Sequence, residues 1–169
     1  TFLNGDGGSE IISGDGINRF DSKDYINTCL YSDKNKIEKF DFVISNPPYS
    51  VDGYMRNLLK NGIDEKSKTF ELLKSINYKD PTIEKLFVER PWQLLKNDGL
   101  AAIVLPQSIL SNDKYLDMRR YIFDNFKILS MVLTSDITFS GTTTSPVILF
   151  LKKTLQSYAK KCHNGKIRL

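Results

Sequence analysis

The residues best suited to chemistry form one short run, Asn46, Pro47, Pro48 and Tyr49, directly after the apolar residues 42–44. A proline has no N–H, so the run offers carbonyl oxygens without competing backbone donors. The side-chain oxygen of Asn46 and the backbone oxygen of Pro47 could together accept both hydrogens of one planar NH2 group. Tyr49 adds a ring that could stack on the molecule carrying that group. The alternative is an ordinary strand-ending turn, but the preceding apolar run favours the chemical interpretation.

The apolar residues 42–44 predict the strand that carries this run. They are bounded by charge on one side and by Pro-Pro on the other, which is typical of a strand buried on both faces in a parallel sheet. Ligands bind at the carboxyl ends of the strands in such sheets, where Asn46 to Tyr49 would emerge. Further strands are predicted at 100–105, 128–134 and 147–151. The last two of these should pair antiparallel, because the loop between them is too short for a helical crossover.

Predicted helices alternate with these strands and give the chain an α/β pattern. Residues 50–79 form a lysine-bearing insertion with two short helices joined near 61–62. Its lysines could contact phosphates, although a solvated surface is the simpler interpretation of any single lysine. A longer helix should open at the Asp-Pro pair 80–81 and stop at 97–99, and another is expected at 112–125. The apolar stripe of the longer helix is Ile83, Leu86, Phe87, Leu94 and Leu95.

Composition indicates one soluble globular domain. The chain has 169 residues, of which 40% are hydrophobic and 26% charged, with a net charge of +4. A charge this small permits a nucleic-acid partner without arguing for one. No apolar run is long enough for a membrane span and no signal peptide is visible, so we expect a cytoplasmic protein without membrane contact. Cys29, Cys162 and the single histidine, His163, define neither a disulfide framework nor a metal site.

Asn-Pro-Pro-Tyr after a strand resembles the catalytic motif of methyltransferases that act on amino groups with S-adenosylmethionine as cofactor. It resembles most the N6-adenine DNA methyltransferases, and within them the modification subunits of type I restriction systems and the related fused restriction-modification enzymes. The resemblance extends from Ile11 to Lys153. It implies a Rossmann-like α/β fold, with a mixed sheet and a reversed last strand.

The resemblance also implies roles for four residues outside the Asn46-to-Tyr49 run. Asp15, after a short strand expected at 10–13, would accept from the amino group of the cofactor's adenine, and Ile17 would pack against that ring. Phe87 would cover the same adenine, and Phe139 would touch the target base. Without the resemblance, Asp15 is equally an acidic turn between glycines, Phe87 is a core residue, and Phe139 is a loop side chain folded onto the core.

The implied substrate is double-stranded DNA, with a specificity subunit and a restriction subunit or fused nuclease as partners. Two other functions stay open. The same motif occurs in glutamine methyltransferases that act on translation release factors, and a methyltransferase-like module could bind DNA or a partner without catalysis. The Phe139 loop and the insertion favour DNA.

The family's earlier cofactor-binding strand and Gly-rich turn have no counterpart before Asp15. We therefore expect residues 1–153 to be the C-terminal part of a catalytic domain truncated on its N-terminal side, and 154–169 to be a basic tail or linker. Such a chain should be inactive alone and should leave one edge of its sheet bare.

Overall fold

The computed structural model describes residues 8–34, 36–49, 51, 53–77, 82–134 and 145–154. Phe139, Cys162, His163, the Asp-Pro pair 80–81 and all but the first residue of the tail predicted at 154–169 lie outside these residues. Among the described residues, no helix has the length and apolar character needed to cross a membrane.

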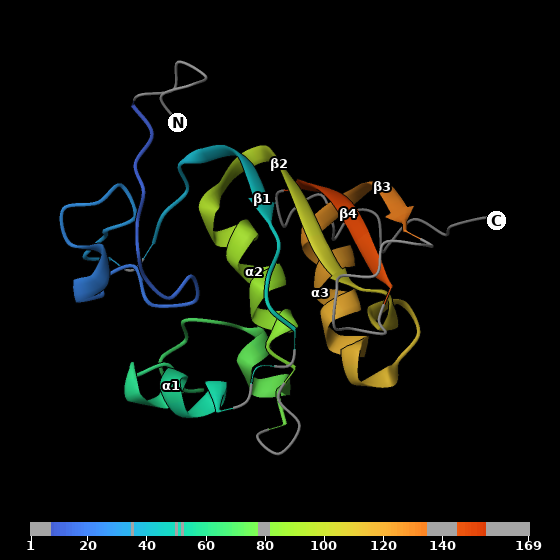
Figure 1. Cartoon of the computed structure of the whole chain (residues 1–169), viewed down its shortest axis with the longest axis horizontal. Coiled ribbons are helices and arrows are strands. Elements are labelled where there is room, and N and C mark those ends of the chain that lie inside the picture. The colour runs from blue at the N-terminus through green and yellow to red at the C-terminus, as the bar shows by residue number, and fades with distance from the viewer. Residues whose placement is uncertain are drawn as a thin grey trace.

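A mixed sheet of four strands, in the order β1-β2-β4-β3, forms the centre of the described structure (Figure 1). β1 runs parallel to β2, whereas β4 is antiparallel to both β2 and β3. The predicted antiparallel pair is therefore confirmed, and the reversed last strand lies between β2 and β3. The strands are β1 (Phe40–Ser45), β2 (Leu95–Pro106), β3 (Phe126–Leu133) and β4 (Pro146–Lys153).

Helices α2 and α3 pack against one face of this sheet (Figure 1). Alternate residues of β2 and β4 point toward them, because side chains alternate between the two faces of a strand. The predicted helix at 112–125 is confirmed, and the residues on its expected buried face, Tyr115, Met118, Ile122 and Phe126, are all buried. The helices are α1 (Tyr54–Lys60), α2 (Glu84–Leu94) and α3 (Leu116–Asn125), with 3-10 turns η2 (Lys23–Tyr25), η3 (Leu72–Ser75), η4 (Gln107–Leu110) and η5 (Asp113–Tyr115).

β1 forms where it was predicted, but it is not buried on both faces. Val43 packs on the main core, whereas Phe42 is 70% exposed and Ile44 is 85% exposed. β1 is an edge strand of the described sheet, and none of the described helices covers the face that carries these two side chains. The run of apolar residues therefore identified the strand correctly but overestimated its burial. β3 is the other edge strand of the described sheet.

One predicted strand does not form, and one predicted helix end is wrong. The segment 10–13 is not a strand, and Ile11 is 83% exposed. α2 ends at Leu94, and residues 97–99 lie inside β2 instead of closing the helix. The register between β1 and β2 shifts here, and Asp98 has a φ of 64°. An Asn-Asp-Gly sequence suits such an irregular strand start as well as it suits a helix end.

The insertion 50–79 contributes its own part of the core. α1 and η3 are its two predicted short helices, and Gly62 in the turn after α1 has a φ of 67°. Their apolar side chains form a second cluster with residues from the N-terminal loop and from the region around the start of α2, whereas Lys60, Lys66, Lys68 and Lys74 are exposed. The buried members of this cluster are Ile17, Tyr54, Met55, Leu58, Ile63, Phe70, Leu73, Ile76, Ile83 and Leu86.

Candidate active site

Asn46 to Tyr49 leave the sheet at the carboxyl end of β1. Because β1 and β2 are parallel, with Ser45 beside Ile103, this end lies at the same edge as the carboxyl end of β2. Pro47 is buried and holds the run against the protein, whereas Asn46 before it is exposed to solvent. Asn46 is thereby available to a molecule that approaches this edge.

Tyr49 is half-buried and turns its hydroxyl group into the protein. Burial, and then the charge of Glu84 in the first turn of α2, raise the pKa of Tyr49. The hydroxyl is therefore protonated at neutral pH, although its oxygen has no hydrogen-bond partner among the described residues. The ring, and not the hydroxyl, is the part of Tyr49 that can serve a ligand.

The loop around Asp15 is held by tertiary hydrogen bonds from two tyrosines. The Asp15 carboxylate oxygen Oδ1 accepts from the backbone N–H of Ile17 at 3.0 Å and from the hydroxyl of Tyr54 at 3.0 Å. The backbone oxygen of Asp15 accepts from the hydroxyl of Tyr25. Both the carboxylate and the main chain of this residue are thus fixed by distant parts of the sequence.

Arg90 of α2 fixes Ile17 and Asn18 of the same loop. Its Nη2 atom donates to the backbone oxygens of Ile17, at 2.6 Å, and Asn18, at 2.7 Å. Its guanidinium lies between two aromatic rings, 4.3 Å from the centroid of Phe20 and 4.7 Å from that of Phe70. Burial lowers the pKa of Arg90 to about 10, so the group stays charged at neutral pH. A charged donor between two ring faces is a strong and well-oriented clamp on a loop.

α2 connects the two candidate regions. Glu84, Phe87 and Arg90 are spaced by three residues, and neighbours at this spacing lie close together on a helix surface. Glu84 acts on Tyr49, and Arg90 binds the Asp15 loop. Between them, the ring of Phe87 lies beside Gly16, where an added Cβ would be 3.9 Å from its Cε1 atom. α2 therefore has side chains that act on the Asn46-to-Tyr49 run and on the Asp15 loop.

The structure brings together three of the residues predicted to hold the cofactor. Asp15 and Phe87 are both half-buried and lie on either side of Gly16. Ile17 belongs to the same apolar cluster as Phe87, but it is fully buried and offers no exposed surface to a ligand in this structure. Phe139, predicted to touch the target base, lies outside the described residues.

Sequence reasoning missed Tyr54, Tyr25 and Arg90. For Arg90 a signal existed, because it follows Ile83 by seven residues and Leu86 by four, which places it on the apolar stripe of the predicted helix. A charged residue on such a stripe must be buried with partners or must distort the packing. Nothing in the local sequence distinguishes Tyr54 from the other tyrosines of the chain.

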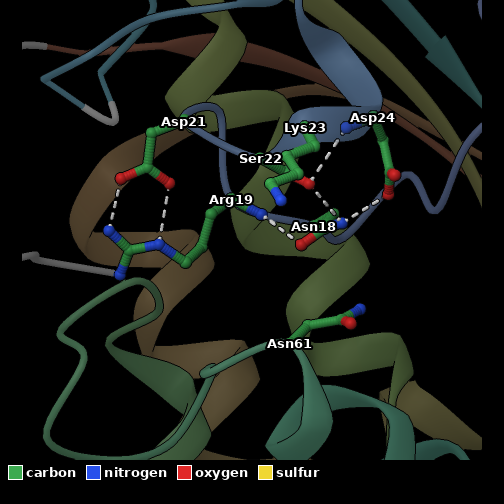
Figure 2. A pocket seen from close by; sticks show the side chains of 7 residues that line it. All are labelled: Asn18, Arg19, Asp21, Ser22, Lys23, Asp24 and Asn61. Carbon is green, nitrogen blue, oxygen red and sulfur yellow. Dashed lines mark hydrogen bonds and ion pairs between the residues drawn. The ribbon is translucent and has the colours of Figure 1, made fainter.

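A polar pocket of about 330 Å³ lies beside the Asp15 loop, between residues 18–24 and the end of α1 at Asn61 (Figure 2). Many of its polar groups already bond one another. The Arg19 guanidinium forms two bonds to the Asp21 carboxylate, and the Asn18 side chain donates to Ser22 and Asp24. We assign no ligand to this pocket. The described residues also contain no group of three His, Cys, Asp or Glu side chains that could hold a metal ion.

Comparison with known sequences identifies relatives in restriction-modification systems. The type II restriction enzyme and methyltransferase RM.Eco57I of Escherichia coli is 30% identical over 117 residues, which are 68% of this chain and 11% of that protein. The putative type II restriction enzyme and methyltransferase RM.MjaORFECS2P of Methanocaldococcus jannaschii is 29% identical over 118 residues, 70% of this chain and 9% of that protein. The chain thus spans only a small part of either relative.

Solved structures confirm the fold class. A putative class I S-adenosylmethionine-dependent methyltransferase from Listeria monocytogenes superposes with a TM-score of 0.53 and 23% identity, over 70% of this chain and 33% of that one. The M protein of the type I restriction enzyme EcoKI gives a TM-score of 0.50 and 22% identity, over 75% of this chain and 23% of that one. At these identities the likeness concerns the fold, which is that of the S-adenosylmethionine-dependent methyltransferases. Residues 14–167 match the sequence profile of the N-6 DNA Methylase family, and the chain belongs to this family, as the run from Asn46 to Tyr49 indicated.

Proposed function

We propose that the protein containing this chain methylates the N6 amino group of adenine in double-stranded DNA, as part of a restriction-modification system. The observation that carries the proposal is the position of Asn46 to Tyr49. In a chain of the N-6 DNA methylase family, these residues leave the carboxyl end of β1, where α/β sheets bind their ligands. Asn46 is exposed there and Tyr49 is half-buried.

The chemistry follows from the acceptors that this run offers. The lone pair of the adenine amino nitrogen is delocalised into the ring, which makes the nitrogen a poor nucleophile. The side-chain oxygen of Asn46 and the backbone oxygen of Pro47 would each accept one amino hydrogen and localise that lone pair on nitrogen. The contribution of these residues is positioning and electrostatic stabilisation, without a general base. An adenine inside a duplex must be flipped out to reach them, and the Tyr49 ring would stack on the extruded base.

Asp15 and Phe87 fit the adenine end of S-adenosylmethionine. In the part of the chain that the structure describes, Asp15 Oδ2 has no hydrogen-bond partner, so it can accept from an exocyclic amino group. The half-buried Phe87 ring beside Gly16 provides the flat apolar surface that a purine needs. When bound, S-adenosylmethionine supplies a methyl group on an electrophilic sulfonium. Ile17 supports this site from the core, and Phe139 remains the proposed contact to the target base.

The experiment is methyl transfer by the full-length protein from S-adenosylmethionine carrying a labelled methyl group. Duplex DNA and total protein from the same source are offered as substrates in parallel, and the modified nucleoside is identified by mass spectrometry. We expect label in DNA as N6-methyladenine. Label in a protein glutamine would favour the release-factor type of methyltransferase, and absence of transfer from a folded protein that binds DNA would favour a non-catalytic module.

A further inference from the structure

Tyr54 makes a contact with Asp15 that spans 39 residues of sequence. Its hydroxyl donates to Asp15 Oδ1 at 3.0 Å, and its ring is buried in the cluster that also contains Ile17 and Leu86. Tyr54 is the first residue of α1 and stands five residues after Tyr49. The residue thus joins the segment that follows the catalytic run to the carboxylate proposed to meet the cofactor's adenine.

The direction of this hydrogen bond is fixed by the environment of the hydroxyl. Burial, and then the charge of Asp15, raise the pKa of Tyr54 far above its usual value. The hydroxyl therefore keeps its proton and donates to the carboxylate at every physiological pH. A hydrogen bond from a buried hydroxyl to a charged oxygen is among the stronger kinds found in proteins.

Within the described residues, both donors to the Asp15 carboxylate bind the same oxygen. The N–H of Ile17 and the hydroxyl of Tyr54 both reach Oδ1. The N–H of Ile17 is only two residues away and allows the carboxylate to rotate about it. The Tyr54 hydroxyl is a second donor, from the separate element α1, and restricts that rotation, so the plane of the carboxylate and the direction of Oδ2 are set before any ligand arrives.

We propose that Tyr54 is a positioning residue, which orients Asp15 so that Oδ2 faces the 6-amino group of the cofactor's purine and selects against a 6-oxo purine. The inference rests on the cofactor role proposed above for Asp15. A carboxylate oxygen held in one direction accepts a hydrogen bond from an amino group there. It repels a carbonyl oxygen at the same place, because both atoms are hydrogen-bond acceptors. A carboxylate free to rotate could turn to the N1–H of a 6-oxo purine and would discriminate less.

The test compares S-adenosylhomocysteine with its deaminated analogue S-inosylhomocysteine, as ligands of the full-length protein in titration calorimetry. We expect the unmodified protein to prefer the adenosyl compound. Tyr54→Phe keeps the buried ring, so the protein should still fold, with an unfolding temperature lowered by the lost hydrogen bond, while the preference falls about threefold to tenfold, the usual range for one hydrogen bond. The loss should come from weaker adenosyl binding with equal or stronger inosyl binding.

Tyr31→Phe is the matched control. It removes another tyrosine hydroxyl, which donates to Asp33 at 2.6 Å on the exposed surface, and it should leave the preference unchanged. Equal weakening of both ligands by Tyr54→Phe would show a merely structural role and overturn the inference, as would an unchanged preference in a protein that methylates DNA. Failure of the unmodified protein to prefer the adenosyl compound would overturn the inference together with the role of Asp15. Failure of methyl transfer would instead contradict the proposed function.

Discussion

The Asp15 loop and the Asn46-to-Tyr49 run lie along the same helix but are held very differently. The Asp15 loop receives hydrogen bonds from Tyr54 and Tyr25 and two more from the buried Arg90. The run from Asn46 to Tyr49 follows an edge strand with one bare face, and its hydroxyl at Tyr49 is buried without a partner among the described residues. One region is locked by side chains, whereas the other depends on proline stiffness and on its strand.

This contrast matches the two tasks proposed for the regions. The adenosyl end of S-adenosylmethionine is unchanged by methyl transfer, so a rigid loop can recognise it with little loss of entropy. A flipped base must enter and leave, so its acceptors have to stand at an open edge. Changes in the Asn46-to-Tyr49 run should therefore reduce methyl transfer without lowering the stability of the fold, and changes in the clamp on the Asp15 loop should reduce stability first.

The largest effect is expected from Asn46→Ala in the full-length protein. Loss of one acceptor on the amino group should lower the methylation rate about 100- to 1000-fold, by analogy with the loss of one oxyanion-hole donor at about 3–4 kcal/mol. Cofactor affinity and unfolding temperature should stay close to those of the unmodified protein, because the Asn46 side chain is exposed. Asn97→Ala, an exposed asparagine near the amino end of β2, is the control and should keep full activity. A collapse of cofactor binding in Asn46→Ala would make that residue structural.

Arg90→Met tests the locked region. Methionine keeps most of the volume but leaves the backbone oxygens of Ile17 and Asn18 buried without their donor. Each unsatisfied buried group costs about 1–3 kcal/mol, so we expect the two oxygens to lower the free energy of unfolding by about 2–6 kcal/mol, measured by denaturant titration. Arg120→Met is the matched control, because Arg120 lies exposed with its Nη1 atom 3.9 Å from Asp117, and should change stability by less than about 0.5 kcal/mol. Similar losses in both variants would contradict the clamp.

Local sequence predicted one of these regions well and the other only in part. The apolar residues 42–44 followed by Asn-Pro-Pro-Tyr located the strand β1 and the point where the chain leaves it, because a strand and its end are encoded by neighbouring residues. The clamp was not predicted, because Tyr54 and Arg90 act on Asp15, Ile17 and Asn18 across long stretches of sequence. The full burial expected for the strand also failed, since burial depends on which elements lie above a strand and not on its own composition.

Tyr49→Ala and Tyr49→Phe separate the ring from the hydroxyl. Tyr49→Phe removes a buried oxygen that has no described partner, so it should keep most activity. Tyr49→Ala should lose about 1–3 kcal/mol of base stacking, which is roughly tenfold to a hundredfold in binding the flipped state. With 2-aminopurine at the target position, fluorescence should be brighter for Tyr49→Ala than for the unmodified protein, because an aromatic face quenches the extruded probe. Equal activity of the two variants would contradict stacking.

The smallest effect is expected at Gly53, the N-cap residue directly before Tyr54 and α1. Its φ of 72° lies in the left-handed region, and no heavy atom stands within 4 Å of an added Cβ. Gly53→Ala should therefore lose about 1 kcal/mol in the free energy of unfolding through backbone strain alone. Gly14→Ala is the matched control, because its φ lies outside that region and its Cβ would meet Tyr25 at an ordinary 3.5 Å, so stability should hold or rise by up to about 1 kcal/mol.

Gly53→Ala also connects the two regions that differ so strongly in how they are held. If relief of the strain shifts Tyr54, the preference for the adenosyl over the inosyl ligand should fall as it does in Tyr54→Phe, although Gly53 touches neither Asp15 nor the ligand. Titration calorimetry of Gly53→Ala with both ligands checks this. A loss of stability with an unchanged preference for the adenosyl ligand would show that the first turn of α1 adapts and keeps the hydrogen bond from Tyr54 to Asp15. The strain at position 53 would then affect the stability of the fold but not the selection of the ligand.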